Sequence, residues 1–313
     1  MDIKFLELKF LVKNFKIRKL QIASREPLLW KDNNYDIGDL CNYLTENNIK
    51  VDLTTNGSLL YYYIRKGKIN KNNVSSLKIS WHTTDPHLYK DISGGKGNYL
   101  MLLKGIKLAI RKEIKISFNR ILFSRYFDDL PQQIRFISNH NLKLKLYTLL
   151  YTPGMSENLY KSNYVHWMIP IEKYVLPNTQ KIVVKKYKLG RSRLQFILKN
   201  GGIVEVKVKS ELTKDNFPCK FCKIKDYCEE EFGDYLRITP DLKYFFCYYR
   251  KDIGGKLTTY DDMKENITKI REWNEDETEM FLKNIKWRFL ITSRCNYNCK
   301  LPKKEYYLCN EKP

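Results

Sequence analysis

The sequence reads Trp287-Arg288-Phe289-Leu290-Ile291-Thr292-Ser293-Arg294-Cys295-Asn296-Tyr297-Asn298-Cys299, and a third cysteine, Cys309, follows ten residues after Cys299. The apolar run from Trp287 to Thr292 predicts a buried β-strand, because such strands are short and rich in aromatic and β-branched residues. A loop with three cysteines directly after a strand can present three thiolates to one iron–sulfur cluster. This stretch therefore predicts a sheet-based fold with a metal cluster at the end of one strand.

Length and composition indicate a globular protein. The chain has 313 residues, of which 43% are hydrophobic and 14% aromatic, enough to bury one large core or a barrel with a smaller appended domain. No apolar run reaches the roughly 18 residues needed to cross a bilayer. The first residues, Met1 to Phe5, lack the charged, apolar and small-residue order of a secretory signal. We therefore expect a cytoplasmic protein.

The net charge of +22 indicates an anionic partner. One interpretation is a surface that binds nucleic acid, which the sequence does not exclude. The other is a lysine-rich surface spread over the whole molecule. The second is favoured because adjacent basic residues come mostly as isolated pairs, such as Arg111-Lys112 and Lys185-Lys186. In either case the positive field favours a substrate that carries phosphate.

Most of the eight cysteines form two groups. The eighth, Cys41, lies in a helical pattern and is expected to be a buried core thiol. Disulfides are rare in a reducing cytoplasm, so closely spaced cysteines indicate a metal site. Their spacing leaves zinc and iron–sulfur clusters both open. The first group is Cys219, Cys222, Cys228 and Cys247, and the second is Cys295, Cys299 and Cys309.

Strands and helices alternate through the first half of the chain. The expected strands cover residues 19–22, 51–53, 76–81, 114–121 and 142–149, and the expected helices cover 36–47, 59–66, 99–111 and 127–139. This alternation is typical of parallel strands with helical crossovers. With residues 287–292 as a sixth strand, it predicts an α/β fold, a partial (βα)6 TIM-like barrel. Functional residues are then expected at the carboxyl ends of the strands.

The strand–helix alternation gives way to other patterns near residues 155 and 260. Residues 182–209 predict two strands around Asn200-Gly201-Gly202, and residues 236–246 predict a hairpin beside the first cysteine group. We therefore expect three parts. Residues 1–155 hold barrel strands two to six, and residues 156–260 hold an auxiliary iron–sulfur cluster. Residues 261–313 hold C-terminal helices, the first barrel strand and the second cysteine group.

Several segments resemble one known family when they are read in circularly permuted order. Residues 287–296 are similar to the opening strand L-R-I-S-V-T-D-R-C-N of that family. Its G-G-E-P-L-L, L-T-T-N-G, S-L-D-x-x-D-P, K-I-N-x-V and R-x-R-L-T-x-D segments are similar to residues 24–29, 53–57, 80–86, 115–119 and 235–241. The family is that of the GTP 3′,8-cyclases (MoaA) of molybdenum cofactor biosynthesis, which are radical S-adenosylmethionine (SAM) enzymes.

The resemblance implies a radical SAM enzyme that uses SAM and two [4Fe–4S] clusters. Reductive cleavage of SAM, with an electron donor as partner, would give a 5′-deoxyadenosyl radical that abstracts hydrogen from a small-molecule substrate, GTP in the family. The implied ligands of the radical-generating cluster are Cys295, Cys299 and Cys309, and those of the auxiliary cluster are Cys219, Cys222, Cys228 and Cys247. The implied SAM-binding residues are Glu26, Thr55, Ser80 and Asn119, and the implied substrate-binding residues are Lys19, Arg237 and Arg288.

The sequence departs from the family at several positions, which keeps other functions open. Ser24 and Arg25 replace the two glycines before Glu26, and an insertion separates Cys309 from Cys299. Gln21 and Tyr235 stand where the family has substrate-binding arginines, and the spacing of the first cysteine group is also found in SPASM and twitch auxiliary domains.

Two alternative functions follow from these departures. One is a SPASM/twitch-type radical SAM enzyme that acts on a peptide or another metabolite. The other is a non-catalytic metal-binding relic with a basic surface that binds nucleic acid. For the first cysteine group, a zinc site with four thiolate ligands is the alternative to an iron–sulfur cluster.

Overall fold

The structure is a computed structural model that describes residues 4–23, 26–95, 97–151, 155–186, 192–208, 235–247, 253–271 and 273–290. Of the seven predicted metal-ligating cysteines, only Cys247 lies within these ranges. Ser24 and Arg25, which replace the glycines of the family pattern, also lie outside the described residues.

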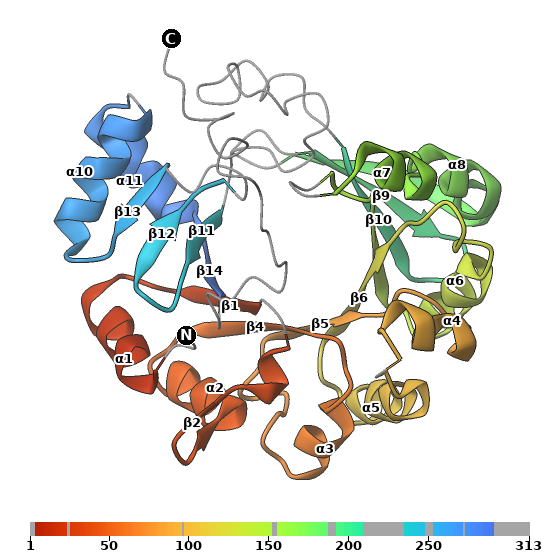
Figure 1. The fold of residues 1–313 in the computed structure, drawn as a ribbon, viewed down its shortest axis with the longest axis horizontal. Helices are drawn as coiled ribbons and strands as arrows, with labels where there is room; N and C mark the ends of the chain where they lie inside the picture. The colour runs from red at the N-terminus through yellow and green to blue at the C-terminus, as the bar shows by residue number, and fades with distance from the viewer. Residues whose placement is uncertain are drawn as a thin grey trace.

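A curved sheet of twelve strands forms the centre of the described fold (Figure 1). Antiparallel strands extend both of its edges, with β12 (Lys243–Phe245) and β13 (Gly254–Lys256) beyond β11, and β9 (Ser192–Leu198) and β8 (Thr179–Lys186) beyond β10. A separate pair is formed by β2 (Lys31–Asp32) and β3 (Tyr35–Asp36). The eight strands between the edges are parallel and follow the order β11 (Tyr235–Ile238), β14 (Lys286–Leu290), β1 (Lys19–Ala23), β4 (Lys50–Thr55), β5 (Ser76–Ser80), β6 (Ile116–Ile121), β7 (Lys143–Tyr147) and β10 (Ile203–Val208).

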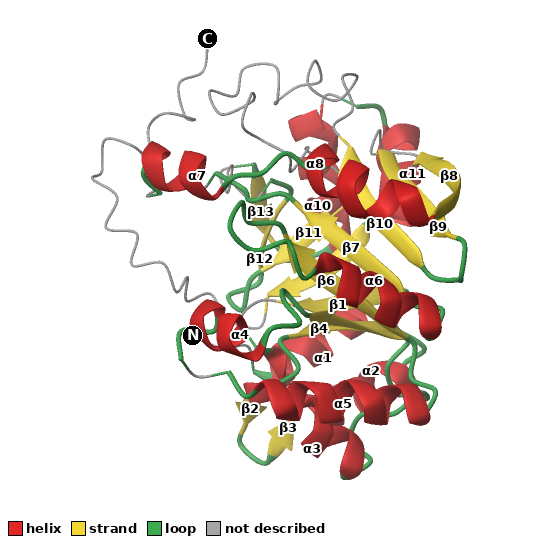
Figure 2. Cartoon of the chain, turned by 90° about the vertical axis from the view of Figure 1, so that its right-hand side faces the viewer, coloured by secondary structure: helices red, strands yellow, loops and turns green. Residues whose placement is uncertain are grey.

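Helices lie on the outside of the curved sheet, as Figures 1 and 2 show from two directions. Asp36 begins α2 by accepting hydrogen bonds from the backbone N–H groups of Gly38 and Asp39, which have no partner within the helix. The helices and single helical turns are α1 (Phe5–Asn14), η1 (Pro27–Leu29), α2 (Ile37–Glu46), α3 (Leu60–Arg65), α4 (Pro86–Ile92), α5 (Tyr99–Arg111), α6 (Leu130–Asn139), α7 (Glu157–Asn163), α8 (Met168–Pro170), η2 (Ile171–Val175), η3 (Leu176–Asn178), α10 (Tyr260–Arg271) and α11 (Glu275–Asn284).

The central strands alternate between apolar and polar residues. In β5, Leu77 and Ile79 are fully buried, whereas Ser76, Lys78 and Ser80 are only partly buried. The same alternation occurs in β7. Parallel strands that are covered on both faces read as continuous apolar runs. The alternation therefore means that the inner face of the sheet bounds a polar space, whereas the outer face packs in the core.

The six predicted barrel strands are present and neighbour one another in the predicted order. β14 pairs in parallel with β1, with Trp287 opposite Leu20 and Phe289 opposite Ile22. A strand from the far end of the sequence thus lies at the first barrel position, which is what a permuted order predicts. The permuted order itself stays a prediction.

The parallel sheet is wider than the six strands that were predicted. β10 continues it beside β7, and β11 continues it beside β14. Both strands come from residues 156–260, which the sequence analysis placed in an auxiliary part. The predicted hairpin is confirmed as β11 and β12, while the predicted boundaries at residues 155 and 260 stay predictions.

Candidate functional site

Glu26 links the segment after β1 to the end of β4. Its Oε1 atom accepts hydrogen bonds from the Thr55 hydroxyl at 2.7 Å and from the Leu28 backbone N–H at 3.0 Å. Its Oε2 atom accepts one from the Asn56 backbone N–H at 2.6 Å. Burial raises the pKa of this carboxyl, and the three hydrogen bonds oppose the rise without cancelling it. Two residues that the family resemblance assigns to SAM, Glu26 and Thr55, are therefore in direct contact.

The other two predicted SAM-binding residues lie on the next strands. Ser80 of β5 is opposite Asn119 of β6, and Thr55 of β4 is opposite Ile79 of β5. The Oδ1 atom of Asn119 is buried and accepts no hydrogen bond from the described residues. A buried polar atom without a partner costs about 1–3 kcal/mol. This carbonyl oxygen is thus suited to accept a hydrogen bond from a ligand.

A buried ion pair holds the segment that follows β5. The Arg120 side chain is fully buried and pairs with Asp129. Asp129 also accepts hydrogen bonds from the hydroxyl groups of Thr83 and Thr84, at 2.8 and 3.0 Å. Burial raises the pKa of Asp129, but its hydrogen bonds and the Arg120 charge bring the net value below the ordinary one. The loop directly after Ser80 is therefore anchored to the barrel.

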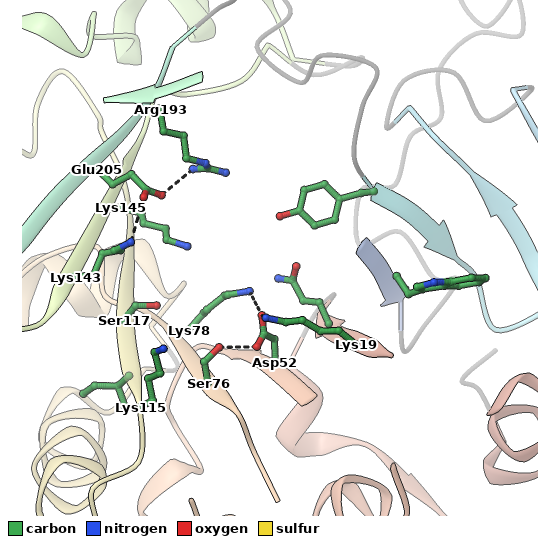
Figure 3. Close-up of a pocket in the computed structure, with 14 residues that line it drawn as sticks. Lys19, Asp52, Ser76, Lys78, Lys115, Ser117, Lys143, Lys145, Arg193 and Glu205 are labelled. Carbon is green, nitrogen blue, oxygen red and sulfur yellow. Dashed lines mark hydrogen bonds and ion pairs between the residues drawn. The ribbon is translucent and has the colours of Figure 1, made fainter. Parts of the chain in front are cut away.

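A cavity of about 330 Å³ opens on the inner face of the sheet (Figure 3). Its lining comes from β1, β4, β5, β6, β7, β9, β10, β11 and β14 and from Lys115, just before β6. Two of the charged side chains are carboxylates, Asp52 and Glu205, and the other six are Lys19, Lys78, Lys115, Lys143, Lys145 and Arg193. The cavity thus carries an excess of four positive charges, which favours an anionic ligand.

Asp52 organises the cations on one side of the cavity. Its carboxylate pairs with the ammonium groups of Lys19 at 3.0 Å and Lys78 at 2.9 Å, and it accepts a hydrogen bond from the Ser76 hydroxyl at 2.7 Å. Burial raises the pKa of Asp52, but these two lysines and the hydroxyl bring it below its ordinary value. Asp52 is therefore a stable anion near neutral pH.

Glu205 organises the cations on the other side of the cavity. Its buried carboxylate pairs with Lys143 at 3.2 Å and Arg193 at 3.1 Å, and it accepts a hydrogen bond from the Gln195 side-chain amide. Burial raises the pKa of Glu205, but the surrounding cations bring it below its ordinary value. The cavity therefore has two carboxylates that each hold two cations.

Lys145 lies between these two groups and extends into the cavity (Figure 3). Its ammonium forms no hydrogen bond or ion pair with the described residues. The pKa of Lys145 is lowered to about 8, chiefly by burial, with Lys78 and Arg193 adding to the fall and Glu205 opposing it. At neutral pH this lysine is mostly charged, yet it is far easier to deprotonate than an exposed lysine.

The three predicted substrate-binding residues have different surroundings. Lys19 lines the cavity, where Asp52 already holds it. Arg288 of β14 donates two hydrogen bonds to Oε1 of Gln21, at 3.3 and 3.2 Å, and its guanidinium lies 4.1 Å from the centre of the Tyr235 ring. Arg237 is buried and donates a hydrogen bond to the backbone carbonyl of residue 246.

The predicted metal ligands are mostly outside the described residues. Cys247 is a buried thiol that follows β12, and the other six predicted ligands fall in undescribed segments. Within the described ranges, no three His, Cys, Asp or Glu side chains are grouped so that they could hold a metal ion. The ligand assignments stay predictions. In the same ranges, no helix has the length and apolar character needed to cross a membrane.

Most of the cavity residues were not predicted from the sequence. Asp52, Lys78, Lys145, Arg193 and Glu205 were not singled out, although each lies on a strand of the barrel sheet or its edge. The signal that could have found some of them is the alternation of lysine and leucine in β7 and of serine, lysine and apolar residues in β5. Charged residues at alternate positions of a central strand indicate that its inner face is not a packed core.

Comparisons with known proteins agree with the motifs. No family model matches the sequence. A Pyrococcus horikoshii protein named Probable GTP 3′,8-cyclase is 27% identical over 238 residues, which are 75% of this chain and 70% of that protein. A Thermococcus kodakarensis protein of the same name is 24% identical over 277 residues, 87% of this chain and 80% of that one. The solved structure of native anSMEcpe with bound AdoMet is 11% identical, with a TM-score of 0.44, and the match covers 96% of this chain and 76% of that chain. The resemblance that the motifs predicted is thereby confirmed, and the chain is a homologue of proteins named Probable GTP 3′,8-cyclase.

Proposed function

We propose that this chain generates a 5′-deoxyadenosyl radical from SAM beside a cation-lined substrate cavity, and that GTP is the first candidate substrate. The observation that carries the proposal is that the same strands bear both sites. β5 bears Lys78 in the cavity and Ser80 at its end, and β6 bears Ser117 in the cavity and Asn119 near its end. At about 3.3 Å per residue, two residues correspond to about 7 Å. A molecule at the strand ends therefore lies within reach of one in the cavity.

Glu26 and Asn119 suit the polar groups of SAM. A carboxylate offers about four acceptor positions, and the described hydrogen bonds to Glu26 occupy three of them. The remaining position suits the ammonium of the methionine part of SAM. The buried carbonyl oxygen of Asn119 suits a donor such as a ribose hydroxyl or the adenine amino group.

The cysteines suit the clusters that this chemistry requires. Three thiolates, from Cys295, Cys299 and Cys309, would hold the cluster that binds SAM, and the group from Cys219 to Cys247 would hold the auxiliary one. When SAM is bound to such a cluster, its reductive cleavage supplies the 5′-deoxyadenosyl radical that removes a hydrogen atom from the substrate. The described residues orient SAM through Glu26 and Asn119 and hold the substrate within the barrel, away from bulk water.

The charge of the cavity suits the phosphate groups of GTP. Six cationic side chains and only two carboxylates line it, and charge-assisted hydrogen bonds from lysine and arginine to phosphate are short and strong. The hydroxyl group of Ser117 adds a neutral polar contact. The similarity to proteins named Probable GTP 3′,8-cyclase supports GTP over other nucleotides.

Anaerobic reconstitution with iron and sulfide tests the radical chemistry. We expect about eight irons per chain for two four-iron clusters, and reductant-dependent release of 5′-deoxyadenosine from SAM. Asn119→Ala should slow that release, whereas the matched variant Asn72→Ala, at an exposed turn, should not. A protein that binds zinc alone, or one that binds iron without releasing 5′-deoxyadenosine, refutes the proposal.

A second candidate is a SPASM/twitch-type radical SAM enzyme that acts on a peptide or another metabolite. The observation in its favour is that the chain itself already engages the predicted GTP contacts. Arg237 donates to a backbone carbonyl, and Arg288 donates to Gln21 where the family has an arginine. Mass spectrometry of reaction mixtures separates the two candidates. GTP consumed together with SAM supports the cyclase, and SAM cleavage that leaves GTP intact supports the second candidate.

A further inference from the structure

Lys145 is placed as a reactive amine rather than as a partner in an ion pair. It lies directly opposite Glu205 in the pairing of β7 with β10, yet the carboxylate of Glu205 is taken by Lys143, Arg193 and Gln195. On the other side of the cavity, the carboxylate of Asp52 forms ion pairs with Lys19 and Lys78. Figure 3 shows the Lys145 side chain extending into the cavity between these pairs. Its amino group therefore faces the space where a ligand would lie.

The surroundings of Lys145 favour its neutral form. The charged or titratable groups that face it are Lys78 from β5, Arg193 from β9, Glu205 from β10 and Tyr235 from β11, together with Lys143 on its own strand. Burial, together with the charges of Lys78 and Arg193, lowers its pKa to about 8, although Glu205 opposes the fall. About a tenth of the amine is then neutral at pH 7, against about one part in 2,000 for a lysine of ordinary pKa. A desolvated lysine beside other cations is an activated nucleophile for carbonyl compounds.

We propose that the Lys145 amine captures an anionic carbonyl compound of the 2-oxo acid class as an imine within the cavity. Two observations favour this class of ligand. The Lys145 side chain extends into the cavity without an ion pair to the described residues, which leaves its nitrogen placed to attack a carbonyl group. The excess positive charge of the lining favours a carboxylate beside that carbonyl group. The proposal goes beyond the radical chemistry, because imine formation requires neither a cluster nor SAM.

The chemistry of this step balances without an oxidant or a reductant. The nitrogen lone pair of Lys145 attacks the carbonyl carbon, a C–N bond forms, and one amine proton moves to the carbonyl oxygen. The resulting carbinolamine then loses that oxygen as water together with the second amine proton, which leaves a C=N bond. The cationic lining offsets the carboxylate charge of the bound compound throughout.

Trapping with borohydride tests the proposal on the full-length chain. Glyoxylate is the probe, timed incubations at pH 6 to 9 are ended with sodium borohydride, and peptide mass spectrometry locates the reduced adduct. We expect labelling at Lys145 to be about two hundredfold faster at pH 7 than at exposed lysines, since its neutral fraction is larger by about that factor. The labelling rate at Lys145 should level off above about pH 8, whereas labelling of exposed lysines keeps rising.

Three comparisons complete the test. Lys145→Arg keeps the positive charge and should abolish the fast adduct, while Lys104→Arg, at an exposed position of α5 outside the cavity lining, should retain it. Acetaldehyde, a neutral aldehyde of similar size, should react at least tenfold more slowly than glyoxylate. Adducts spread evenly over exposed lysines, fast labelling that survives in Lys145→Arg, or equal rates for the two aldehydes would each overturn the proposal. Release of 5′-deoxyadenosine is measured separately, so failure of the radical chemistry leaves this test intact.

Discussion

Replacing Asp52 with asparagine tests whether the cavity binds an anion. The carboxylate of Asp52 holds the ammonium groups of Lys19 and Lys78 at 3.0 and 2.9 Å. A substrate phosphate therefore competes with Asp52 for the same two cations. In Asp52→Asn both lysines keep their charge and lose this competitor. We expect the variant to bind GTP and inorganic triphosphate more tightly than the wild-type chain does.

The size of the effect follows from the ion-pair distances. An anion on the far side of the Lys78 ammonium would lie at about twice the ion-pair distance, or about 6 Å, from the Asp52 carboxylate. At an effective dielectric constant of about 20, two unit charges at that distance repel each other by about 3 kcal/mol. Water in the cavity and dissolved salt screen this repulsion. We therefore expect a gain of about 1–1.5 kcal/mol, which is about a 5- to 10-fold lower Kd.

Calorimetric titration with inorganic triphosphate at low and at physiological salt measures this change. Ser76→Ala is the matched control, because it removes the hydroxyl that donates to Asp52 at 2.7 Å and leaves every charge in place; its Kd should change less than about twofold. The gain in Asp52→Asn should shrink as salt rises. Unchanged or weaker binding in a folded Asp52→Asn chain would refute the view that the cavity is an anion site.

Three further substitutions test the strand ends and the core. Asn119→Ala removes a buried oxygen that accepts no hydrogen bond from the described residues, so the unfolding free energy should stay equal or rise by about 1 kcal/mol. The calorimetric Kd for SAM should rise about tenfold. A loss of stability without weaker SAM binding would contradict this expectation. Asp129→Asn leaves a fully buried guanidinium without its carboxylate and should lower the unfolding free energy in urea by about 3–5 kcal/mol. The pKa of Asp129 is lower in the folded chain than its ordinary value of about 3.9. Its contribution to the unfolding free energy is therefore complete above that ordinary value and is lost as pH falls through the folded pKa. The difference in unfolding free energy between wild type and Asp129→Asn should consequently narrow below about pH 4. Gly57→Ala places a Cβ atom 2.4 Å from the Leu102 side chain at a φ of 79°. It should destabilise the fold more than Gly67→Ala, because Gly67 has a φ of 72° but open space around it. Equal melting temperatures for the two variants would contradict this steric argument.

The barrel strands could be predicted because their outward residues are apolar at a period of two. Leu77 and Ile79 in β5 are fully buried, and the helices that separate such strands carry their own apolar stripe. Glu26 and Thr55 were both assigned to SAM by the resemblance, and the hydrogen bond between them was not predicted. Local patterns therefore account for the strands and the helices.

The cavity could not be predicted because it depends on pairings between distant segments. Glu205 meets Lys145 only because β10 folds back beside β7, about sixty residues away along the chain. Whether Arg193 also reaches Glu205 depends on the antiparallel register of β9 with β10. A register shift of one residue would move each of these side chains to the other face of the sheet. The sequence contains the charged residues but not the register that pairs them.

The surroundings of Arg237 depend on strand pairing in the same way, and its role in substrate binding stays a prediction. Its guanidinium reaches the backbone carbonyl of residue 246 because β11 and β12 form a hairpin, and a motif does not reveal such a contact.

The two carboxylates also bear on which anions the cavity can hold. A monovalent anion gains less from cations that Asp52 and Glu205 already hold, because each carboxylate offsets one of the two positive charges beside it. A polyphosphate interacts with several cations at once, and the attraction grows with the product of the charges, so it can replace these internal partners. Lys145 is the exception, because its ammonium forms no ion pair with the described residues. A small carboxylate compound therefore gains most beside Lys145, while a triphosphate gains most between Lys19 and Lys78. Binding of the two kinds of anion should consequently respond to different substitutions, which makes the Asp52 and Lys145 variants independent tests of the same cavity.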